Sequence, residues 1–462
     1  GRDWTAATQL FATDDPLTFT APHLQYLMDS PIELGDTELH SFTVGDGEGQ
    51  RIRVALHHLG SDEIAARYVD DVERIVRESR AVFGEYPRFD AGEYTFIADY
   101  LPWADGDGME HRNSTILTAP YGLERAYVGL LGTVAHEFFH AWNVERIRPA
   151  SLEPFDFERA NMSGELWLAE GFTSYYGNLL LHRAGVSGLD RLLDSLGGTI
   201  NAVRRSPAVQ LRSAVQMSRL APFVDAARPV DATYWDNTFL SYYTFGAAIG
   251  LGLDLTLRDR SDGEITLDDY MRALWQRFGA PDAGSVDVGR AYTTADAAEV
   301  LAEVSGDPGF AREFFARHIE GNEAIDHGPL LLRAGLLVRP RRPQTPHVGM
   351  SVQRTEAGLE VTAPTTWGAP AYEAGIDLGD VVLQLDGRSL RSPDELYDAI
   401  GEHEPGDDVT LRIRRRGGEE LTVSLTLAPN PIIEIVPVER TGEGLEPSQR
   451  AFREGWLGSR VH

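Results

Sequence analysis

The stretch His136-Glu137-Phe138-Phe139-His140 carries the strongest structural signal in this chain, because it sets two histidines four residues apart in a long apolar segment. Residues four apart project from one face of an α-helix, so both imidazoles can reach the same metal ion. Glu137 stands beside them, near the position that a catalytic zinc site leaves open for water. The pattern therefore predicts a Zn²⁺ site, with one ion per chain and Glu137 as general base. The alternative is a chance pair of core histidines.

The segments around this stretch predict one long helix-rich region that follows a region of strands. Residues 123–144 are apolar and free of proline, which predicts a buried helix, and a second helix is predicted over 166–184. Residues 185–335 are mostly helical by pattern, with a loop-rich patch at 221–233. Ahead of the metal-binding stretch the pattern predicts strands at 51–57, 94–98 and 114–118, and a helix over 62–82.

Composition limits both the metal ligands and the partners. The 462 residues include no cysteine and no lysine, and 71 Asp and Glu against 42 cationic residues give a net charge of −29. Any metal must therefore be bound by His, Asp or Glu. The acidity argues against a nucleic-acid partner, and the apolar runs are too short to span a membrane. The same balance predicts a heavily hydrated acidic surface adapted to high salt.

A catalytic zinc site needs a third protein ligand. Glu170 lies at the start of the second apolar helix, where an unpaired acid is costly, so coordination of the metal is one interpretation of it. An exposed glutamate at a helix start is the other, and spacing alone does not separate the two. The downstream acids that could serve are Glu145, Glu153, Glu158, Glu165 and Glu170.

Several motifs, in the same order along the chain, resemble the glycyl aminopeptidase family of gluzincin zinc metallopeptidases. The resemblance covers residues 25–460 and implies an α+β fold: a thermolysin-like zinc peptidase domain, with a β subdomain and a mostly helical subdomain, followed by a PDZ domain. It also implies that His136, His140 and Glu170 are the zinc ligands and that Glu137 is the general base. The matching stretches are Asp29–Gly35, Gly108–Thr115, His136–Pro149, Trp167–Tyr176 and Ser241–Gly246.

The Gly108-Met109-Glu110 stretch resembles the exopeptidase motif of these enzymes, in which a glutamate receives the free amino group of the substrate. Such a carboxylate, held at a fixed distance from zinc, would make the enzyme an aminopeptidase. An ordinary loop acid is the alternative for Glu110. The nearby Arg112 could partly neutralise its charge.

A tyrosine hydroxyl is expected to donate to the oxyanion that forms during catalysis. By resemblance this residue is Tyr243, with Tyr242 as the second candidate and packing in an aromatic-rich helix as the alternative role. The family usually has a lysine before the glycine of this motif, whereas this lysine-free chain has Phe245.

The resemblance also divides the chain. Residues 1–30 are expected to be the remnant of an N-terminal β domain, so the chain is expected to be truncated or processed. Residues 31–338 form the catalytic domain, 339–430 the PDZ domain and 431–462 a tail that packs on the core. The PDZ groove would hold a peptide C-terminus at the loop of Val348, Gly349 and Met350; the alternative is an empty groove in a domain that braces the catalytic part.

Together these observations predict a zinc aminopeptidase that releases small N-terminal residues, glycine or alanine, from peptides with a free N-terminus. The preference for small residues comes from the resemblance alone. Two other functions stay open: an endopeptidase on the same scaffold, and a PDZ adaptor on a degenerate peptidase. The resemblance implies a periplasmic or secreted protein, and a cytoplasmic location stays open because no signal-like segment opens the chain.

Overall fold

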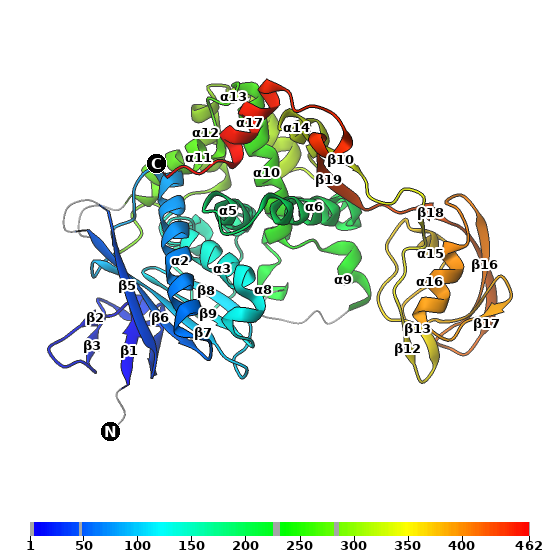
Figure 1. Ribbon diagram of the computed structural model, residues 1–462, viewed down its shortest axis with the longest axis horizontal. Coiled ribbons are helices and arrows are strands. Elements are labelled where there is room, and N and C mark those ends of the chain that lie inside the picture. The colour runs from blue at the N-terminus through cyan, green and yellow to red at the C-terminus, as the bar shows by residue number, and fades with distance from the viewer. Residues whose placement is uncertain (1–3, 46–48, 225–231, 281–285, 462) are drawn as a thin grey trace.

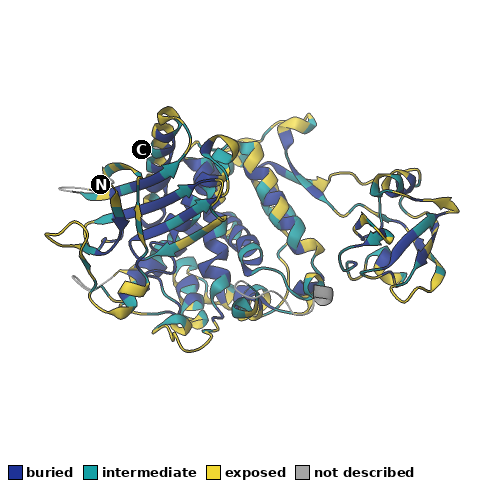
Figure 2. Cartoon of the chain, turned by 90° about the horizontal axis from the view of Figure 1, so that it is seen from below, coloured by how far each residue is buried: buried dark blue, intermediate teal, exposed yellow. Residues whose placement is uncertain are grey.

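A computed structural model describes residues 4–45, 49–224, 232–280 and 286–461. A large body of mixed α and β structure lies beside a smaller, β-rich body formed by residues 346–429, and the C-terminus lies on the large body (Figure 1). The two bodies have separate apolar cores, which appear as two dark-blue interiors in Figure 2. The α+β fold class predicted from the sequence is confirmed.

A five-stranded sheet forms one side of the large body, in the order β5-β6-β7-β9-β8. The three central strands run parallel, and the two edge strands run antiparallel to their neighbours. Predicted strands at 51–57, 94–98 and 114–118 are confirmed as β6, β7 and β9. The bounds are β5 Glu38–Val44, β6 Gln50–His58, β7 Glu93–Tyr100, β8 Asp107–His111 and β9 Ser114–Ala119.

The two faces of this sheet are covered differently. Helices α2 and α3 pack on the inner face, whose residues belong to the main apolar core (Figure 1). Short N-terminal elements lie on the outer face, where Ala7 packs against Ala55 and Ile97. Their bounds are β1 Thr5–Thr8, β2 Phe11–Ala12, β3 Phe19–Thr20, α1 Leu24–Met28 and β4 Ile32–Gly35, with β1 paired to β4 and β2 to β3.

The helix predicted over 62–82 is confirmed as α2, Asp62–Phe83. It begins where the Ser61 side chain accepts a hydrogen bond from the Ile64 N–H, and it ends at Gly84, which adopts the left-handed conformation of a helix C-cap. Its apolar stripe faces the sheet and α3.

The second half of the large body is helical, as predicted for 185–335. Part of the predicted loop-rich patch at 221–233 is instead helical, in α8 and from residue 232 onward in α9, while 225–231 lie outside the described residues. Short π-helical turns follow α11 at Trp275–Gly279 and α13 at Phe315–Ile319. The helices are α3 Leu123–Phe139, α4 Leu166–Ala169, α5 Gly171–Arg183, α6 Leu189–Arg205, α7 Ala214–Ser218, α8 Ala221–Val224, α9 Ala232–Thr238, α10 Tyr242–Arg260, α11 Leu267–Leu274, α12 Thr294–Ser305, α13 Pro308–Phe314 and α14 His327–Arg333.

Two predicted helices have different ends in the structure. The helix predicted to run to residue 144 stops at Phe139, and the following turns carry Val144 at a φ of 108°. The helix predicted over 166–184 is divided at Glu170 into α4 and α5. Both departures occur at the candidate metal site.

The smaller body is built on a sheet of order β12-β13-β14-β16-β17, with β15 paired to β14 and α16 packed beside β12. After residue 339 the sequence pattern predicts strands at 359–362, 381–385, 409–413 and 421–427 and a helix at 393–401, and the structure contains all of these elements. The bounds are β12 Val352–Thr355, β13 Gly358–Val361, α15 Pro370–Glu373, β14 Val381–Leu385, β15 Arg388–Ser389, α16 Pro393–Gly401, β16 Asp408–Arg414 and β17 Glu420–Thr426.

The C-terminal residues return to the large body. Strand β19, Ile433–Pro437, pairs antiparallel with β10, Leu336–Pro340, and a second pairing joins β11, Pro346–His347, to β18, Ala428–Pro429. The smaller body is therefore attached through a two-stranded ribbon. The last helix, α17 Pro447–Leu457, buries Trp456, whose indole N–H donates to the Tyr175 hydroxyl.

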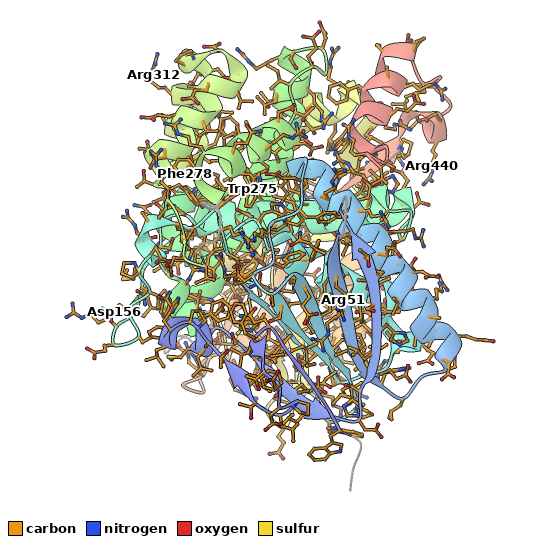
Figure 3. All side chains as sticks on the ribbon, turned by 90° about the vertical axis from the view of Figure 1, so that its left-hand side faces the viewer. Arg51, Asp156, Trp275, Phe278, Arg312 and Arg440 are labelled. Carbon is orange, nitrogen blue, oxygen red and sulfur yellow. The ribbon has the colours of Figure 1, made fainter. Side chains whose placement is uncertain are left out.

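Charged side chains cover the surface. In Figure 3 Asp156, Arg312 and Arg440 project outward from the periphery, whereas Trp275 and Phe278 lie inside the helical half. None of the helices in the described part of the chain is both long and apolar enough to span a bilayer.

Candidate metal centre

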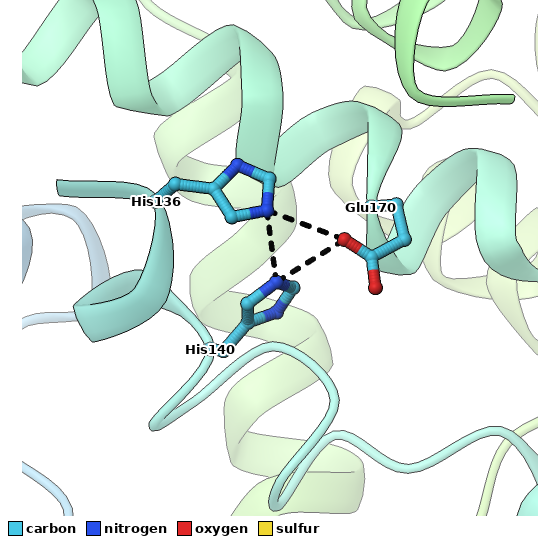
Figure 4. Close-up of side chains that lie close together, drawn as sticks. All are labelled: His136, His140 and Glu170. Atoms are coloured by element: carbon cyan, nitrogen blue, oxygen red, sulfur yellow. Dashed lines mark hydrogen bonds and ion pairs between the residues drawn. The ribbon is translucent and has the colours of Figure 1, made fainter. Parts of the chain in front are cut away.

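Three side chains converge between α3 and the junction of α4 with α5 (Figure 4). Glu170 Oε2 lies 3.3 Å from His136 Nε2 and 3.2 Å from His140 Nε2, and the two Nε2 atoms are 3.1 Å apart. The imidazole planes are inclined by 81°. The three atoms form a nearly equilateral triangle.

The size of this triangle fits a metal ion. Ligands about 2.1 Å from one ion at tetrahedral angles are separated by roughly 3.4 Å. The observed separations of 3.1–3.3 Å are close to that value. Two imidazoles and one carboxylate also form a donor set that suits zinc, so the residues present fit this metal.

The chain after His140 holds that imidazole in place. His140 Nδ1 lies 2.7 Å from the backbone carbonyl oxygen of Asn143, so an N–H at Nδ1 would leave Nε2 free to face the triangle. The Asn143 amide donates in turn to the Leu168 and Ala169 carbonyls next to Glu170. Because α3 ends at Phe139, the turn that follows it connects His140 to the segment that carries Glu170.

Glu170 is positioned by a close backbone contact behind it. A Cβ built on Gly171 would lie 2.3 Å from Gly246 Cα, and one built on Gly246 would lie 2.1 Å from the Trp167 carbonyl oxygen. Only glycine permits this approach of α10 to the α4–α5 junction. Two glycines of the motifs noted in the sequence therefore fix Glu170 relative to the tyrosines at the start of α10.

The electrostatics of the triangle favour a charged carboxylate. Burial opposes ionisation of Glu170, but the two imidazoles outweigh it and hold the pKa of its carboxyl well below the usual range. Burial likewise disfavours a charged His140, but Glu170 and Glu110 raise the pKa of this imidazole well above its ordinary value. For His136 burial prevails, and its pKa is lowered.

Glu137 is buried against the sheet edge rather than in the triangle. A Cβ on Gly108 would lie 2.5 Å from Glu137 Oε1, so β8 packs directly on this carboxylate. Burial raises the pKa of Glu137 well above its usual value. Within the described residues the Glu137 Oε2 atom is buried and has no hydrogen-bond partner. This oxygen is therefore available to accept a proton.

Strand β8 brings Glu110 to the same place. One carboxylate oxygen each from Glu110 and Glu137 and one ring nitrogen of His140 lie within 4.8 Å of one another. Met109, one residue earlier, is half-exposed. The guanidinium of Arg112 is buried and donates to Asp90 at 2.8 Å. The expectation that Arg112 partly neutralises Glu110 is therefore wrong.

Of the two tyrosines, Tyr243 lies nearer the metal ligands. The Tyr243 ring stacks on His136 with ring centroids 6.0 Å apart. The Tyr242 ring is buried and stacks on Tyr243 with centroids 5.0 Å apart. Phe245 is also buried in the apolar core. A lysine ammonium there would need a buried partner, and the phenyl ring needs none.

Hollows flank the triangle on two sides. A cleft of about 470 Å³ reaches Glu170 and Glu110, and six acidic residues but only two arginines line it. A second hollow of about 330 Å³ reaches His136 and Glu137 past Gly129, Gly132 and Gly177. The triangle of His136, His140 and Glu170 therefore lies between an acidic cleft and a hollow lined by small residues.

Sequence reasoning assigned no role to Asp29 and His111 of the acidic cleft, and it considered Glu145 only as a possible zinc ligand. Asp29 lies 3.0 Å from His111 Nδ1 and accepts from the Arg112 backbone N–H. Burial and the neighbouring Asp29 raise the pKa of Glu145 to about 7. Asp29 and His111 lie within the stretches that carried the resemblance, but only the fold brings them together.

The three residues predicted as a PDZ carboxylate-binding loop lie between β11 and β12. Val348 and Met350 are buried, and Gly349 has a φ of 74°, which favours glycine. The Tyr397 hydroxyl of α16 lies 3.5 Å from the Met350 carbonyl oxygen. In the sheet order β12 is an edge strand, the place where an added peptide strand would pair.

Comparison with family models finds two matching segments. Residues 129–249 match the M61 glycyl aminopeptidase model and residues 346–427 match the PDZ domain model. The first segment contains His136, Glu137, His140, Glu170 and Tyr243, and the second contains the loop at 348–350.

Among solved structures, an aminopeptidase N family protein from Idiomarina loihiensis is 26% identical to this chain. The match covers 98% of this chain and 77% of that one, with a TM-score of 0.78.

Shorter matches join this chain to two DegP-like proteins whose names describe periplasmic serine endoproteases. One, from Rhizobium meliloti, is 29% identical over 113 residues, which are 24% of this chain and 22% of that protein. The other, from Halomonas elongata, is 40% identical over 62 residues, or 13% of each. The chain thus spans less than a quarter of the length of these curated relatives.

Proposed function

Because residues 129–249 match the M61 glycyl aminopeptidase model and residues 346–427 match the PDZ domain model, we propose that this protein is a zinc-dependent aminopeptidase. The observation that carries the proposal is the triangle of His136, His140 and Glu170, with the buried Glu137 beside it. Zinc held by the triangle would acidify a water molecule and polarise the scissile carbonyl group.

Glu137 is the proposed general base. Its buried, unpartnered oxygen takes a proton from the attacking water and returns it to the amine that leaves. The high pKa produced by burial suits a group that must hold this proton between the two steps. The Tyr243 hydroxyl donates a hydrogen bond to the carbonyl oxygen as negative charge develops on it.

Glu110 is the proposed anchor for the amino terminus of the substrate. Its carboxylate lies beside Glu137 and His140 and opens into the acidic cleft, so a protonated amine there meets an unneutralised negative charge. The first residue of the peptide would occupy this cleft, and the remainder would leave along the hollow past Gly132 and Gly177. The preference for glycine or alanine at the first position is part of the proposal and rests on the family.

The PDZ domain is proposed to hold the C-terminus of a peptide. The supporting features are the loop at 348–350 and the edge position of β12.

A panel of four amides tests the aminopeptidase proposal: glycyl, alanyl, leucyl and acetyl-glycyl amides with zinc present. We expect hydrolysis of the first two to exceed that of leucyl amide, and acetyl-glycyl amide to remain intact because it lacks the amine that Glu110 receives. Cleavage of the blocked amide at a rate similar to glycyl amide would replace the proposal with an endopeptidase.

The role of Glu137 is tested by Glu137→Gln. Since acid–base catalysis contributes about 10²–10⁴-fold, we expect kcat for glycyl amide to fall by at least about 100-fold. The zinc content of the variant, measured by elemental analysis, should equal that of the parent chain, because Glu137 is not a ligand. A near-normal rate with zinc retained would remove Glu137 from its role.

A further inference from the structure

A second group of metal-ligand side chains lies on the outer face of the five-stranded sheet. Glu33, His57 and Asp99 each offer one ligand atom, and these atoms lie within 4.8 Å of one another. They belong to β4, β6 and β7. The metal centre described above uses residues packed on the inner face, so the two groups are separated by the sheet.

Strand register explains why the three residues meet. His57 and Asp99 are direct partners in the parallel pairing of β6 with β7. They follow Ala55 and Ile97 by two residues and therefore share the outer face with them. Ala7 of β1 packs on that pair of apolar residues, and Glu33 is its partner across β1 and β4. The N-terminal strand pair thus lays a carboxylate over a histidine and an aspartate.

The distances agree with coordination of one ion. His57 Nδ1 lies 3.3 Å from Asp99 Oδ1 and 3.9 Å from Glu33 Oε1. Ligands about 2.1 Å from one tetrahedral ion are separated by roughly 3.4 Å, so a small inward movement of Glu33 completes the set.

Two oxygens in this group accept no hydrogen bond from the described residues, although His57 Nδ1 lies 3.3 Å from one of them in an ion-pair contact that lacks hydrogen-bond geometry. Within the described part of the chain, Glu33 Oε2 and Asp99 Oδ1 are buried and have no hydrogen-bond partner. Burial and the neighbouring Asp99 raise the pKa of Glu33 to about 7. Buried carboxylate oxygens without donors are rare and costly in folded proteins, and a cation is one way of satisfying them.

A cation can reach these side chains. They lie on the wall of a hollow of about 570 Å³ that Trp103, Asp105 and Asp107 also line, and the two additional aspartates make it more attractive to positive charge. About a third of the His57 side chain and a quarter of the Asp99 side chain are exposed. Water molecules could therefore fill the remaining coordination positions.

We propose that Glu33, His57 and Asp99 form a second binding site for a divalent transition-metal ion, with zinc as the best match. One imidazole with two carboxylates is a mixed set that zinc accepts and that is less suited to magnesium or calcium. An ion there would tie the N-terminal strand pair β1–β4 to the outer face of the sheet. This site is independent of the proposed peptidase activity.

Zinc stoichiometry tests the proposal without reference to activity. The His136→Gln/His140→Gln double variant removes two ligands of the first centre, and elemental analysis after equilibration with zinc and desalting counts what remains. We expect two zinc ions in the parent chain, one in the double variant and none after His57→Gln is added. In the double variant zinc should also raise Tm, and His57→Gln should abolish that rise.

Two further variants complete the design. His40→Gln, which removes a histidine of β5 that lies beside Glu38, should leave the remaining zinc in place. Asp99→Asn should remove it, which guards against a folding defect particular to His57→Gln; circular dichroism checks that each chain is folded. A folded double variant that binds no zinc, or whose zinc survives both His57→Gln and Asp99→Asn, would overturn the proposal.

Discussion

At the scale of single residues, Gly108 shows how a backbone position controls a catalytic group. A Cβ on Gly108 would lie 2.5 Å from Glu137 Oε1 and 2.6 Å from Thr133 Cγ2, so these atoms already occupy that space. The resemblance in sequence marked Gly108 as part of a substrate-binding motif. The structure adds a physical reason for glycine there: the carboxylate of Glu137, the proposed general base, occupies the space that a side chain at residue 108 would need.

We therefore predict that Gly108→Ala impairs catalysis by displacing Glu137. A displacement of about 1 Å at a reacting group can lower the rate by about 100-fold. Steady-state kinetics on glycyl amide should show a loss of kcat of that order, with zinc content unchanged.

The matched control is Gly106→Ala, where the nearest atom to a new Cβ is Pro120 Cδ at 3.6 Å, an ordinary contact. It should keep nearly full activity. Equal effects of the two substitutions would show that the β8 backbone, rather than the contact with Glu137, is responsible.

Acid should weaken zinc binding at the first centre. Burial alone would lower the pKa of His140, but the carboxylates of Glu170 and Glu110 raise it. In the metal-free chain this imidazole therefore keeps its proton up to a higher pH than usual. Zinc must displace that proton. Affinity should therefore rise with pH while His140 is protonated, by about tenfold per unit for one proton, and level off above its pKa.

A competition titration against a chelating dye from about pH 6 to about pH 9 measures this dependence. It should use the His57→Gln chain, so that only the first centre contributes. An affinity that does not change over this range would contradict the assignment of a proton to His140.

The sequence could predict the His136 and His140 pair because a helix relates residues four apart without help from the rest of the fold. Glu170 needed the resemblance, since spacing alone left it one of several acids. Asn143 could not be predicted: it holds the site only because α3 stops at Phe139, and the apolar pattern continues past that point.

At the scale of elements, the crossing of α10 over the α4–α5 junction sets the distance between Glu170 and Tyr243. Gly171 and Gly246 allow the two backbones to touch, and Gly250 lies further along the same contact against Phe172. Ring stacking of Tyr243 on His136 completes the link from α10 back to α3. The proposed metal ligands and the proposed oxyanion donor are thus held by packing among four helices, α3, α4, α5 and α10.

We predict that Gly246→Ala separates these helices. Its Cβ would lie 2.1 Å from the Trp167 carbonyl oxygen and 2.7 Å from Gly171 Cα, and backbone atoms cannot move aside cheaply. Overpacking of this kind should lower the free energy of unfolding by about 3 kcal/mol. Denaturant unfolding of the metal-free chain measures this loss, and zinc affinity should fall because Glu170 moves with the junction.

The control for this prediction is Gly198→Ala in α6, where the new Cβ meets nothing within 4 Å and the position is exposed. Alanine there should stabilise the helix by about 0.5–1 kcal/mol. A Gly246→Ala chain as stable as the Gly198→Ala chain would show that the close contact is unimportant.

Element types were predictable where the pattern was local and repeated, as in α2 and in the alternating strands of the smaller body. Helix ends at the site could not be predicted, because the turn after His140 and the junction at Glu170 are fixed by the contacts of Asn143 and by the close approach of Gly171 to Gly246 rather than by apolar periodicity. The pairing of β10 with β19 could not be predicted from the sequence either. Nothing in either strand shows that its partner lies almost a hundred residues away, beyond the PDZ domain.

At the scale of the whole molecule, the acidic charge is the dominant property. Two buried arginines are paired with acids inside the fold, Arg183 with Asp268 and Arg258 with Asp254. Each of these pairs cancels one positive and one negative charge, so the net charge of −29 is carried by other acids, which lie near the surface. Repulsion among them opposes the compact state, and salt screens it.

We predict that salt stabilises this protein at neutral pH. Raising sodium chloride from about 0.1 M to about 1 M shortens the Debye length from about 10 Å to about 3 Å, which removes most of the repulsion between separated surface acids. The Tm of the metal-free chain, followed by circular dichroism, should rise by a few degrees, since about 1 kcal/mol shifts Tm by roughly 2–4 °C in a domain of about 150–250 residues and by less in a larger one. The same titration near the sequence pI of 4.8 should give a much smaller rise, because the net charge is then close to zero. An equal rise at both pH values would assign the effect to ion-specific hydration, and no rise at neutral pH would mean that the acids are spaced widely enough for water alone to separate them.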